Sequence, residues 1–289
     1  MPTLLSVVVG LAMLGGGGLA LSWPIRWLKA AEAEAGLQMD VKSPDAAGDV
    51  LMEQLSFFML GGLRSLAAEI LVLDATNAWV EQDWPRAERR WQAITMLCPT
   101  RENYWINASR EMALNAVGHI WRNSLLSPTE QAELAYRYRM RGVRFLTDGI
   151  AHNPSSAVLY MNLGDLHANL ARQPSFEKAA AAYHRAVELG ATSLYRRQEF
   201  YSLCRIRGRE REAWELGRRL YDTPGQRQPS LKCLLFVLQH KIDVPQAERL
   251  SPEQLFGSAA QARIELSRFA RNQLRFPTTG ITSYLAAEE

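Results

Sequence analysis

Residues 83–99 read DWPRAERRWQAITMLCP and contain the spacing that decides the fold. Ala87, Trp91, Ile94 and Pro99 stand at offsets 0, 4, 7 and 12, so three of them share one helix face and the proline ends the helix. The same ladder recurs at Gly142, Leu146, Gly149 and Pro154, at Ala179, Tyr183, Ala186 and Ala191, and at Ala213, Gly217, Leu220 and Pro224, the last with its proline one residue early. Each small residue lets a neighbouring helix approach closely. The ladder therefore predicts the second helix of a helix hairpin, repeated along the chain.

The sequence from Val50 to about Leu274 has the same helical periodicity. Apolar residues recur at spacings of three and four, and short breaks of Pro, Gly or Ser separate the runs, with no convincing alternation of apolar and polar residues. With 289 residues, of which 47% are hydrophobic and 22% charged, the chain has the composition of a folded protein. The sequence thus predicts an all-α body.

The predicted second helices resemble those of the tetratricopeptide repeat (TPR), which carry a small residue, an aromatic, another small residue and a terminal proline at these offsets. Tyr160, Leu163 and Gly164 match the Trp-x-x-Leu-Gly start of a TPR first helix, with tyrosine in the tryptophan position. The resemblance covers Leu63 to Pro224 as four degenerate units. It implies a right-handed α-solenoid of helix hairpins that binds proteins in a groove lined chiefly by first helices.

Two features depart from the repeat pattern. The first helices carry Asp74-Ala75 and Phe200-Tyr201 where the Leu-Gly pair belongs, and insertions at SLLSP (residues 124–128) and ARQPSF (residues 171–176) lengthen two units. The segment LGGLRSLAAEILVLDA (residues 60–75) is also similar to a group of uncharacterised bacterial membrane-anchored TPR-like proteins. That similarity implies a location but no mechanism.

The N-terminus predicts one transmembrane helix. Thr3 to Trp23 carries no charged residue, and about 20 residues at a rise of 1.5 Å span a hydrocarbon core of about 30 Å. Trp27 and Lys29 suit the membrane interface that follows, and Pro24 ends the helix. A cleaved signal peptide is the alternative, but no basic residue precedes the apolar run.

We expect a single-pass protein of the inner (cell) membrane. Basic residues follow the span and none precedes it, which by the positive-inside rule places the body in the cytoplasm. N-terminal anchors in bacteria more often export the domain that follows, and on this ground we favour an extracytoplasmic body. The side of the membrane stays open.

The chain divides by composition into five parts: an anchor and its flank (residues 1–29), a juxtamembrane linker (30–49), TPR-like repeats (50–224), C-terminal capping helices (225–274) and a flexible tail (275–289). Pro229 to His240 is apolar enough to be buried. Ser251 is a candidate N-cap with Pro252 at the first helical position, and it starts a helix that we expect to reach about Leu274.

The residues give no sign of catalysis. The five histidines never form HExxH, the three cysteines lie far apart, and no nucleophile elbow, kinase or Walker motif is present. His167 and His184 could meet across one hairpin, and Glu69 and Asp74 could pair with Arg64, Arg86, Arg89 or Arg90. We therefore predict a protein that is not an enzyme, with no cofactor, no metal and no small-molecule substrate.

Basic and aromatic residues are the better candidates for binding. Arg196, Arg197 and Arg205 on the first helix of the fourth unit could face the groove and hold acidic groups, and Tyr104 and Trp105 could serve as aromatic contacts. Arg137, Arg141 and Arg144 form a second stripe, which could receive an anion or face solvent. Basic and aromatic residues do not interleave on one surface, so nucleic acid is not an expected partner.

These features together predict a membrane-anchored scaffold or assembly factor. It would bind membrane-associated protein partners through a TPR-like groove and would contact the membrane through residues 3–23. The alternative is a permanent accessory subunit of a larger membrane protein complex.

Overall fold

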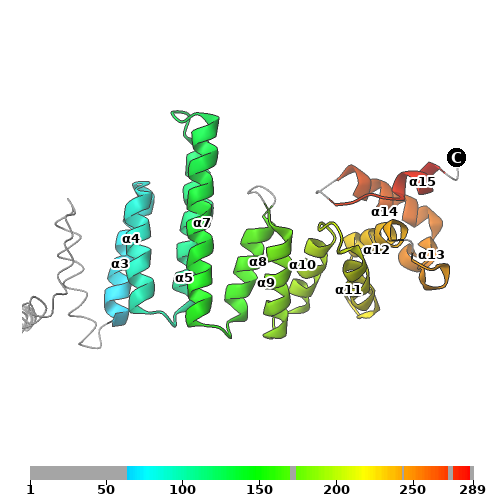
Figure 1. Cartoon of the computed structure of the whole chain (residues 1–289), viewed down its shortest axis with the longest axis horizontal. Helices are drawn as coiled ribbons and strands as arrows, with labels where there is room; N and C mark the ends of the chain where they lie inside the picture. Colours follow the sequence, from blue (N-terminus) through cyan, green and yellow to red (C-terminus); the bar gives the residue numbers. More distant parts are fainter. Residues whose placement is uncertain (1–63, 170–173, 243, 273–275, 287–289) are drawn as a thin grey trace, which may run out of the picture. The chain divides into compact units, whose positions relative to one another are not determined.

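The computed structural model describes residues 64–169, 174–242, 244–272 and 276–286. These residues form helices joined by turns, and they contain no strand (Figure 1). The all-α prediction is confirmed for this part of the chain. The predicted anchor, the linker and repeat residues 50–63 lie outside the described residues, and no described helix is long and apolar enough to cross a membrane.

Neighbouring helices in the chain pack on one another (Figure 1). α3 (Arg64–Val80) packs on α4 (Trp84–Leu97), and α8 (Ala157–Ala168) on α9 (Phe176–Glu188). Between them, α5 (Glu102–Arg110), the π-helical η1 (Glu111–Ala116) and α6 (Val117–Arg122) form one continuous helix that packs on α7 (Pro128–His152). The remaining elements are α10 (Ser193–Leu203), α11 (Glu210–Asp222), α12 (Pro229–Lys241), η3 (Gln246–Glu248), α13 (Pro252–Phe256), α14 (Ala259–Arg271) and α15 (Ile281–Ala286). The four predicted ladders lie on α4, α7, α9 and α11.

Side-chain caps start several of these helices. Asp83 accepts a hydrogen bond from the Arg86 backbone N–H at the start of α4, and Ser156 caps α8 by accepting from the Leu159 backbone N–H. Ser127 and Glu130 form a capping box before α7. The first backbone N–H groups of a helix have no acceptor within the helix, and short polar side chains at these positions supply one. The sequence itself therefore places these helix boundaries.

Small residues of the ladders lie where two helices come closest. Ala87, Ala179 and Ala213 are fully buried. A Cβ added at Gly142 on α7 would stand 2.5 Å from the Ala113 Cβ. One added at Gly164, the glycine of the Leu-Gly pair on α8, would stand 2.5 Å from the ring of the ladder residue Tyr183. No side chain fits at such distances, so the ladder spacing fixes how α7 approaches η1 and how α9 approaches α8.

An ion-pair cluster joins α3 to α4. Asp74 on α3 accepts hydrogen bonds from Arg86 and Arg90 on α4, which confirms the predicted pairing of this carboxylate with arginines. Partial burial acts to raise the pKa of Asp74, but the bonds from Arg86 and Arg90 outweigh it and hold the pKa below its ordinary value. Asp74 therefore serves the hairpin as a structural anion.

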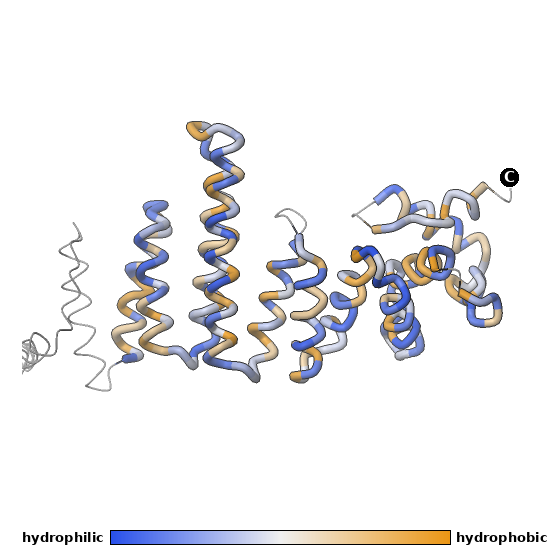
Figure 2. Tube along the Cα trace, in the orientation of Figure 1, coloured by the Kyte–Doolittle hydropathy of each residue, from blue (hydrophilic) through white to orange (hydrophobic). Residues whose placement is uncertain are grey.

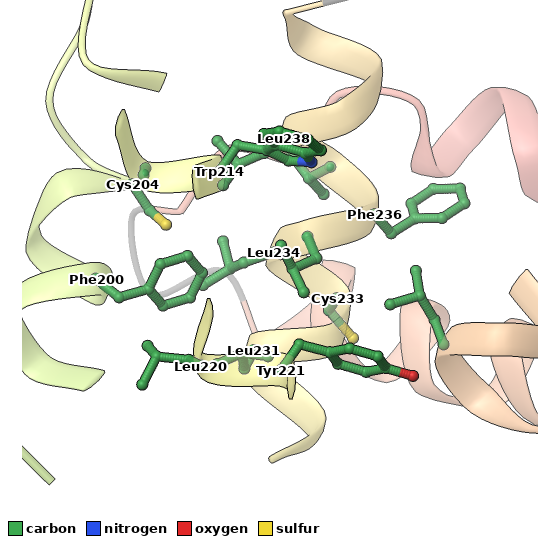
Figure 3. Packing of buried hydrophobic residues seen from close by; sticks show 14 of the residues in the cluster. Phe200, Cys204, Trp214, Leu220, Tyr221, Leu231, Cys233, Leu234, Phe236 and Leu238 are labelled. Atoms are coloured by element: carbon green, nitrogen blue, oxygen red, sulfur yellow. The ribbon is translucent and has the colours of Figure 1, made fainter. Parts of the chain in front are cut away.

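The C-terminal part of the fold is built around α12. This helix is largely hydrophobic along its length (Figure 2), and most of its side chains are buried, as predicted. Phe200 on α10 projects toward Leu234 on α12 (Figure 3), and Gly217 on α11 makes room for it, since a Cβ at Gly217 would stand 2.6 Å from the Phe200 ring. One apolar cluster thus joins α10, α11 and α12.

Two predictions for the C-terminal residues are wrong. The helix that begins at Ser251, with the predicted N-cap, ends at Phe256, because Gly257 adopts a left-handed conformation (φ 93°) and a new helix starts after Ser258. Residues 276–286 of the predicted flexible tail are packed on the body. Ile281 is buried, and the Tyr284 ring lies 5.3 Å from the Phe236 ring between centroids.

Gly142→Ala should destabilise the fold. Alanine adds up to about 1 kcal/mol of helix propensity over glycine. Its Cβ, however, would stand 2.8 Å from the Ser109 carbonyl oxygen and 3.0 Å from the Ala113 backbone nitrogen. Overpacking typically costs about 1–3 kcal/mol, so we expect urea denaturation to show a net loss in the free energy of unfolding.

Thr147→Ala is the matched control, because it places the same side chain on the exposed face of α7. We expect it to change the free energy of unfolding by no more than about 0.5 kcal/mol. Equal stability of the two variants would show that α7 and η1 do not approach as closely as Gly142 indicates.

Candidate functional site

Three arginines predicted to contact a partner lie on α10 or just after its end. Arg197 donates a hydrogen bond to the Gln226 side chain in the turn that follows α11, and Arg196 is half-buried. Both stay predicted partner contacts. They lie apart in the chain from Tyr104 and Trp105 on α5, and the described contacts do not bring the two groups together.

Arg205, the third predicted partner contact, is engaged within the fold. Its guanidinium carbon lies 3.4 Å from the centroid of the Phe276 ring and 5.1 Å from that of Phe176, and Nη1 donates to the Tyr201 carbonyl oxygen at 2.9 Å. Removal from water lowers the pKa of Arg205 to about 10. This cation–π contact ties the residues after α14 to the end of α10.

The two aromatic candidates on α5 are also engaged within the fold. Trp105 is only 5% exposed, and its Nε1 donates to the Pro99 carbonyl oxygen at 2.9 Å. Gly149 on α7 leaves the room for this ring. Trp105 is thus a wedge between α5 and α7 and not the predicted groove contact. Tyr104 donates to Glu69 Oε1 at 2.7 Å, and burial together with this carboxylate raises the pKa of Tyr104 to about 12.

A cleft of about 210 Å³ opens between α5 with η1 and α8, the first helices of neighbouring hairpins. Its apolar lining includes Ile106, Leu146 and Leu166, which are largely buried. We call it the first-helix cleft. Its lining residues are Ile106, Ser109, Arg110, Ala113, Leu114, Leu146, Asn162, Asp165, Leu166 and Asn169.

Polar side chains stand on both sides of the first-helix cleft. Asn162, Asp165 and Asn169 follow one face of α8 and its end, and the exposed Arg110 stands on α5. The Tyr183 hydroxyl donates to Asp165 Oδ1 at 2.8 Å, which fixes that carboxyl at the cleft wall. Loss of water around the carboxyl raises the pKa of Asp165, and the bond from Tyr183 opposes this rise. The cleft therefore offers hydrogen-bonding groups of both charges around an apolar lining.

The π-helical turn η1 lies where α5 borders this cleft. Ser109 and Ala113, which line the cleft, are also the residues that Gly142 approaches from α7. π-turns within α-helices occur frequently at functional sites. The close approach of α7 on one side and the cleft on the other thus meet at the same irregular turn.

Two further clefts lie elsewhere in the body. One, of about 520 Å³, lies between α4 and α7 and includes Arg141 and Arg144. These basic side chains pair with acidic ones, Arg141 with Glu88 at 2.6 Å and Arg144 with Asp148 at 3.5 Å. The predicted arginine stripe on α7 is therefore balanced within the chain. The other cleft, of about 690 Å³, is lined from α11 and from residues 247–254.

The histidines on α8 and α9 do not form a common site. His184 lies 2.8 Å by Nδ1 from Glu199 Oε1 on α10 and 3.4 Å by Nε2 from Glu188 Oε1, so it faces α10 and not His167. His167 is 7% exposed and lies near Arg139, which donates to the Leu166 carbonyl oxygen at 3.4 Å. These contacts are those of histidines held in the packing.

The buried cysteines and the acidic residues show no catalytic or metal-binding arrangement within the described residues. Burial raises the pKa of Cys204 and Cys233 and thus keeps both thiols neutral. Within residues 64–169, 174–242, 244–272 and 276–286, no three His, Cys, Asp or Glu side chains are grouped so that they could hold a metal ion.

The first-helix cleft was not predicted, although the sequence held a signal for it. Asn162, Asp165 and Asn169 are spaced at i, i+3 and i+7 around the Leu163-Gly164 pair of the best-matching first helix. Polar residues that line a cleft beside such a helix are candidates for partner contact. Arg110 carried no comparable signal, because the π-turn that follows it has no sequence signature.

No protein-family model matches the chain, and a comparison with curated proteins finds no match either.

His167 should make stability fall at mildly acidic pH. Burial, helped by the charges of Arg139 and Lys178, lowers the pKa of His167 to about 4, against about 6.5 in an unfolded chain. Between these values the unfolded chain binds the proton and the folded protein does not, so the free energy of unfolding decreases as the pH falls.

The measurement is urea denaturation of the wild type and His167→Gln at pH 7.5 and pH 5. We expect the wild type to lose about 2 kcal/mol more than the variant over this interval. Parallel pH profiles would mean that the imidazole accepts its proton in the folded protein as readily as in the unfolded chain.

Proposed function

We propose that this chain is a non-catalytic, membrane-anchored scaffold or assembly factor that binds a segment of a protein partner in the first-helix cleft. The body is proposed to be a TPR-like right-handed α-solenoid, with one transmembrane helix over residues 3–23. The proposal rests above all on the position and size of the cleft.

The repeat architecture is supported by the ladder residues. Ala87, Ala179 and Ala213 are buried at matching positions of successive hairpins, and Gly142 takes the same position on α7. The Tyr183 ring lies over Gly164, so the bulky ladder residue of one helix fills the space left by the Leu-Gly pair of the other. These are the packing relations that the resemblance to TPR hairpins implies.

The size of the first-helix cleft favours a peptide over a small molecule. Pockets that enclose drug-sized ligands usually measure about 300–1,000 Å³, whereas this cleft holds about 210 Å³. That volume suits one or two side chains of an extended or helical segment. The cleft is also bordered by first helices, the side of a TPR-like stack that forms its groove.

The lining suggests which side chains the partner offers. Ile106, Leu146 and Leu166 would receive an apolar side chain, and the exposed Arg110 would meet an acidic or carbonyl group beside it. The Asn162 amide donates a hydrogen bond to the Val158 carbonyl oxygen at 2.8 Å, which holds the Asn162 side chain in place. A short segment with an apolar residue next to an acidic one is therefore the proposed ligand.

A photo-cross-linking amino acid at position 162 of the full chain should capture the partner in cells. Because Asn162 borders the cleft, we expect discrete adducts on gels after irradiation. The same residue at position 147, on the exposed face of α7, is the control and should give none. Adding Arg110→Glu to the position 162 variant should weaken the adducts.

Equal adducts from both positions, or adducts that ignore Arg110→Glu, would exclude the first-helix cleft as the binding site. Adducts to several proteins in fixed proportion, which remain together after detergent extraction, would favour the alternative of a permanent accessory subunit.

Deletion of residues 1–30 should release the body from the membrane fraction. Thr3 to Trp23 is the uncharged stretch of sufficient length, so its loss removes the proposed anchor. Fractionation should find the truncated chain in the soluble part, and circular dichroism should stay helical. Retention in the membrane fraction would indicate a second membrane contact, with residues 55–63 (LSFFMLGGL) as the first segment to test.

A further inference from the structure

α3 carries apolar residues on two opposite faces. One face is buried and packs on α4 through Ala67, Ala68, Leu71, Ala75 and Ala78. The other carries large aliphatic side chains that stay in contact with solvent: Leu66 is 54% exposed, Ile70 48%, Leu73 68% and Val80 68%. A helix with apolar residues all round is ordinarily covered on more than one side.

The exposed face has the spacing of a coiled-coil seam. Leu66, Ile70, Leu73, Asn77 and Val80 are separated by four, three, four and three residues, which is a heptad repeat of core positions. In this register Ile70 and Asn77 take position a, and the other three take position d. Ile at a with Leu at d favours a parallel coiled coil of two helices, and a single Asn at a fixes the alignment and the number of the helices. We call these five residues the α3 seam.

Single exposed apolar residues are common and need no explanation. Leu125, in the turn between α6 and α7, is 92% exposed and stands alone in this way. The α3 seam differs because its aliphatic members lie on one face over the whole length of a helix of 17 residues. A helix of that length is about 25 Å long, which gives a continuous strip for another helix to follow.

Charges beside the α3 seam do not oppose a parallel pair of identical helices. Position g is Glu69 and the following position e is Asp74, and in a parallel pair these two face each other across the interface. Asp74 is paired with Arg86 and Arg90, and Arg86 also pairs with Glu81, so the e side presents two positive and two negative charges. Glu69, which accepts a hydrogen bond from Tyr104 of its own chain, would therefore meet a balanced cluster on the other copy, in which the arginines offset the charge of Asp74.

We propose that α3 binds α3 of a second copy of this chain, forming a parallel two-stranded coiled coil through the α3 seam. The choice of a second copy rests on the Ile-Leu-Asn register along the exposed face of α3. The dimer is independent of the peptide site in the first-helix cleft. Parallel pairing also brings the two Arg64 ends together, as the proposed anchoring of both chains in one membrane requires.

Cross-linking of the full chain in mild detergent tests the proposal. Asn77→Cys, made in a Cys98→Ala background to remove the partly exposed native thiol, places two thiols face to face at position a. Mild oxidation should convert most of the Asn77→Cys protein to a species of twice the 32.5 kDa chain mass. Thr76→Cys in the same background is the control, because the two copies of position g lie on opposite sides of the coil and should not cross-link.

A charge in the seam should separate the copies. Leu73→Glu places two carboxylates opposite each other at position d, and light scattering should show the mass of the protein part falling by half. Leu125→Glu makes the same change at an isolated exposed leucine and should leave the mass of the dimer unchanged. Circular dichroism of both variants checks that they stay folded, and the position 162 cross-link checks that the peptide site is intact.

Four results would overturn the proposal. Asn77→Cys and Thr76→Cys could cross-link to the same low extent, or Leu73→Glu could keep the dimeric mass. A wild-type monomer whose position 73, as Leu73→Cys in the Cys98→Ala background, resists a thiol reagent both in membranes and in detergent would mean that the chain covers the seam with its own residues. If the thiol at position 73 of a monomeric protein is protected in membranes but reacts in detergent, lipid covers the α3 seam.

Discussion

The described fold depends on glycines that let neighbouring helices approach closely. At Gly142 the α7 backbone comes so near the end of α5 and the η1 turn that even a methyl group would meet the Ser109 carbonyl oxygen. At Gly149, Gly164 and Gly217, an aromatic ring of the neighbouring helix occupies the space instead, namely Trp105, Tyr183 and Phe200. Glycine thus acts in two ways, by admitting backbone and by admitting a ring. The positions of α5, α8 and the cleft between them follow from these contacts.

The sequence predicted this part of the fold because the determining residues lie within two turns of one another. A small residue, a bulky residue and a small residue at offsets 0, 4 and 7 identify one helix face without any knowledge of the partner helix. The caps at Asp83, Ser127 and Ser251 are equally local. Gly257 gives no comparable local signal, since a glycine in a helical pattern either continues the helix at a modest cost or ends it.

Side-chain partners far along the chain were beyond such reasoning. Arg205 was predicted to face a groove because it is basic and ends a first helix, but its place is decided by Phe276, which belongs to a segment that sequence alone left without structure. The position of the Trp105 ring similarly depends on Gly149, which lies on another helix. In both cases a contact with a residue far along the chain determines that the side chain packs within the fold. The polar face of α8 was predictable in principle, because its residues are neighbours on one helix.

Each described helix packs mainly on helices that lie near it in the chain. Contacts of this kind close short loops, so a hairpin can form early and the next can add to it without waiting for distant segments. The same locality governs the response to force. If one end of the body is held and a bound partner pulls elsewhere, the load passes through the hairpins one after another, and the weakest opens first while the others stay folded. Such a chain lengthens in steps, and it acts as a compliant link with resistance set by individual hairpin interfaces.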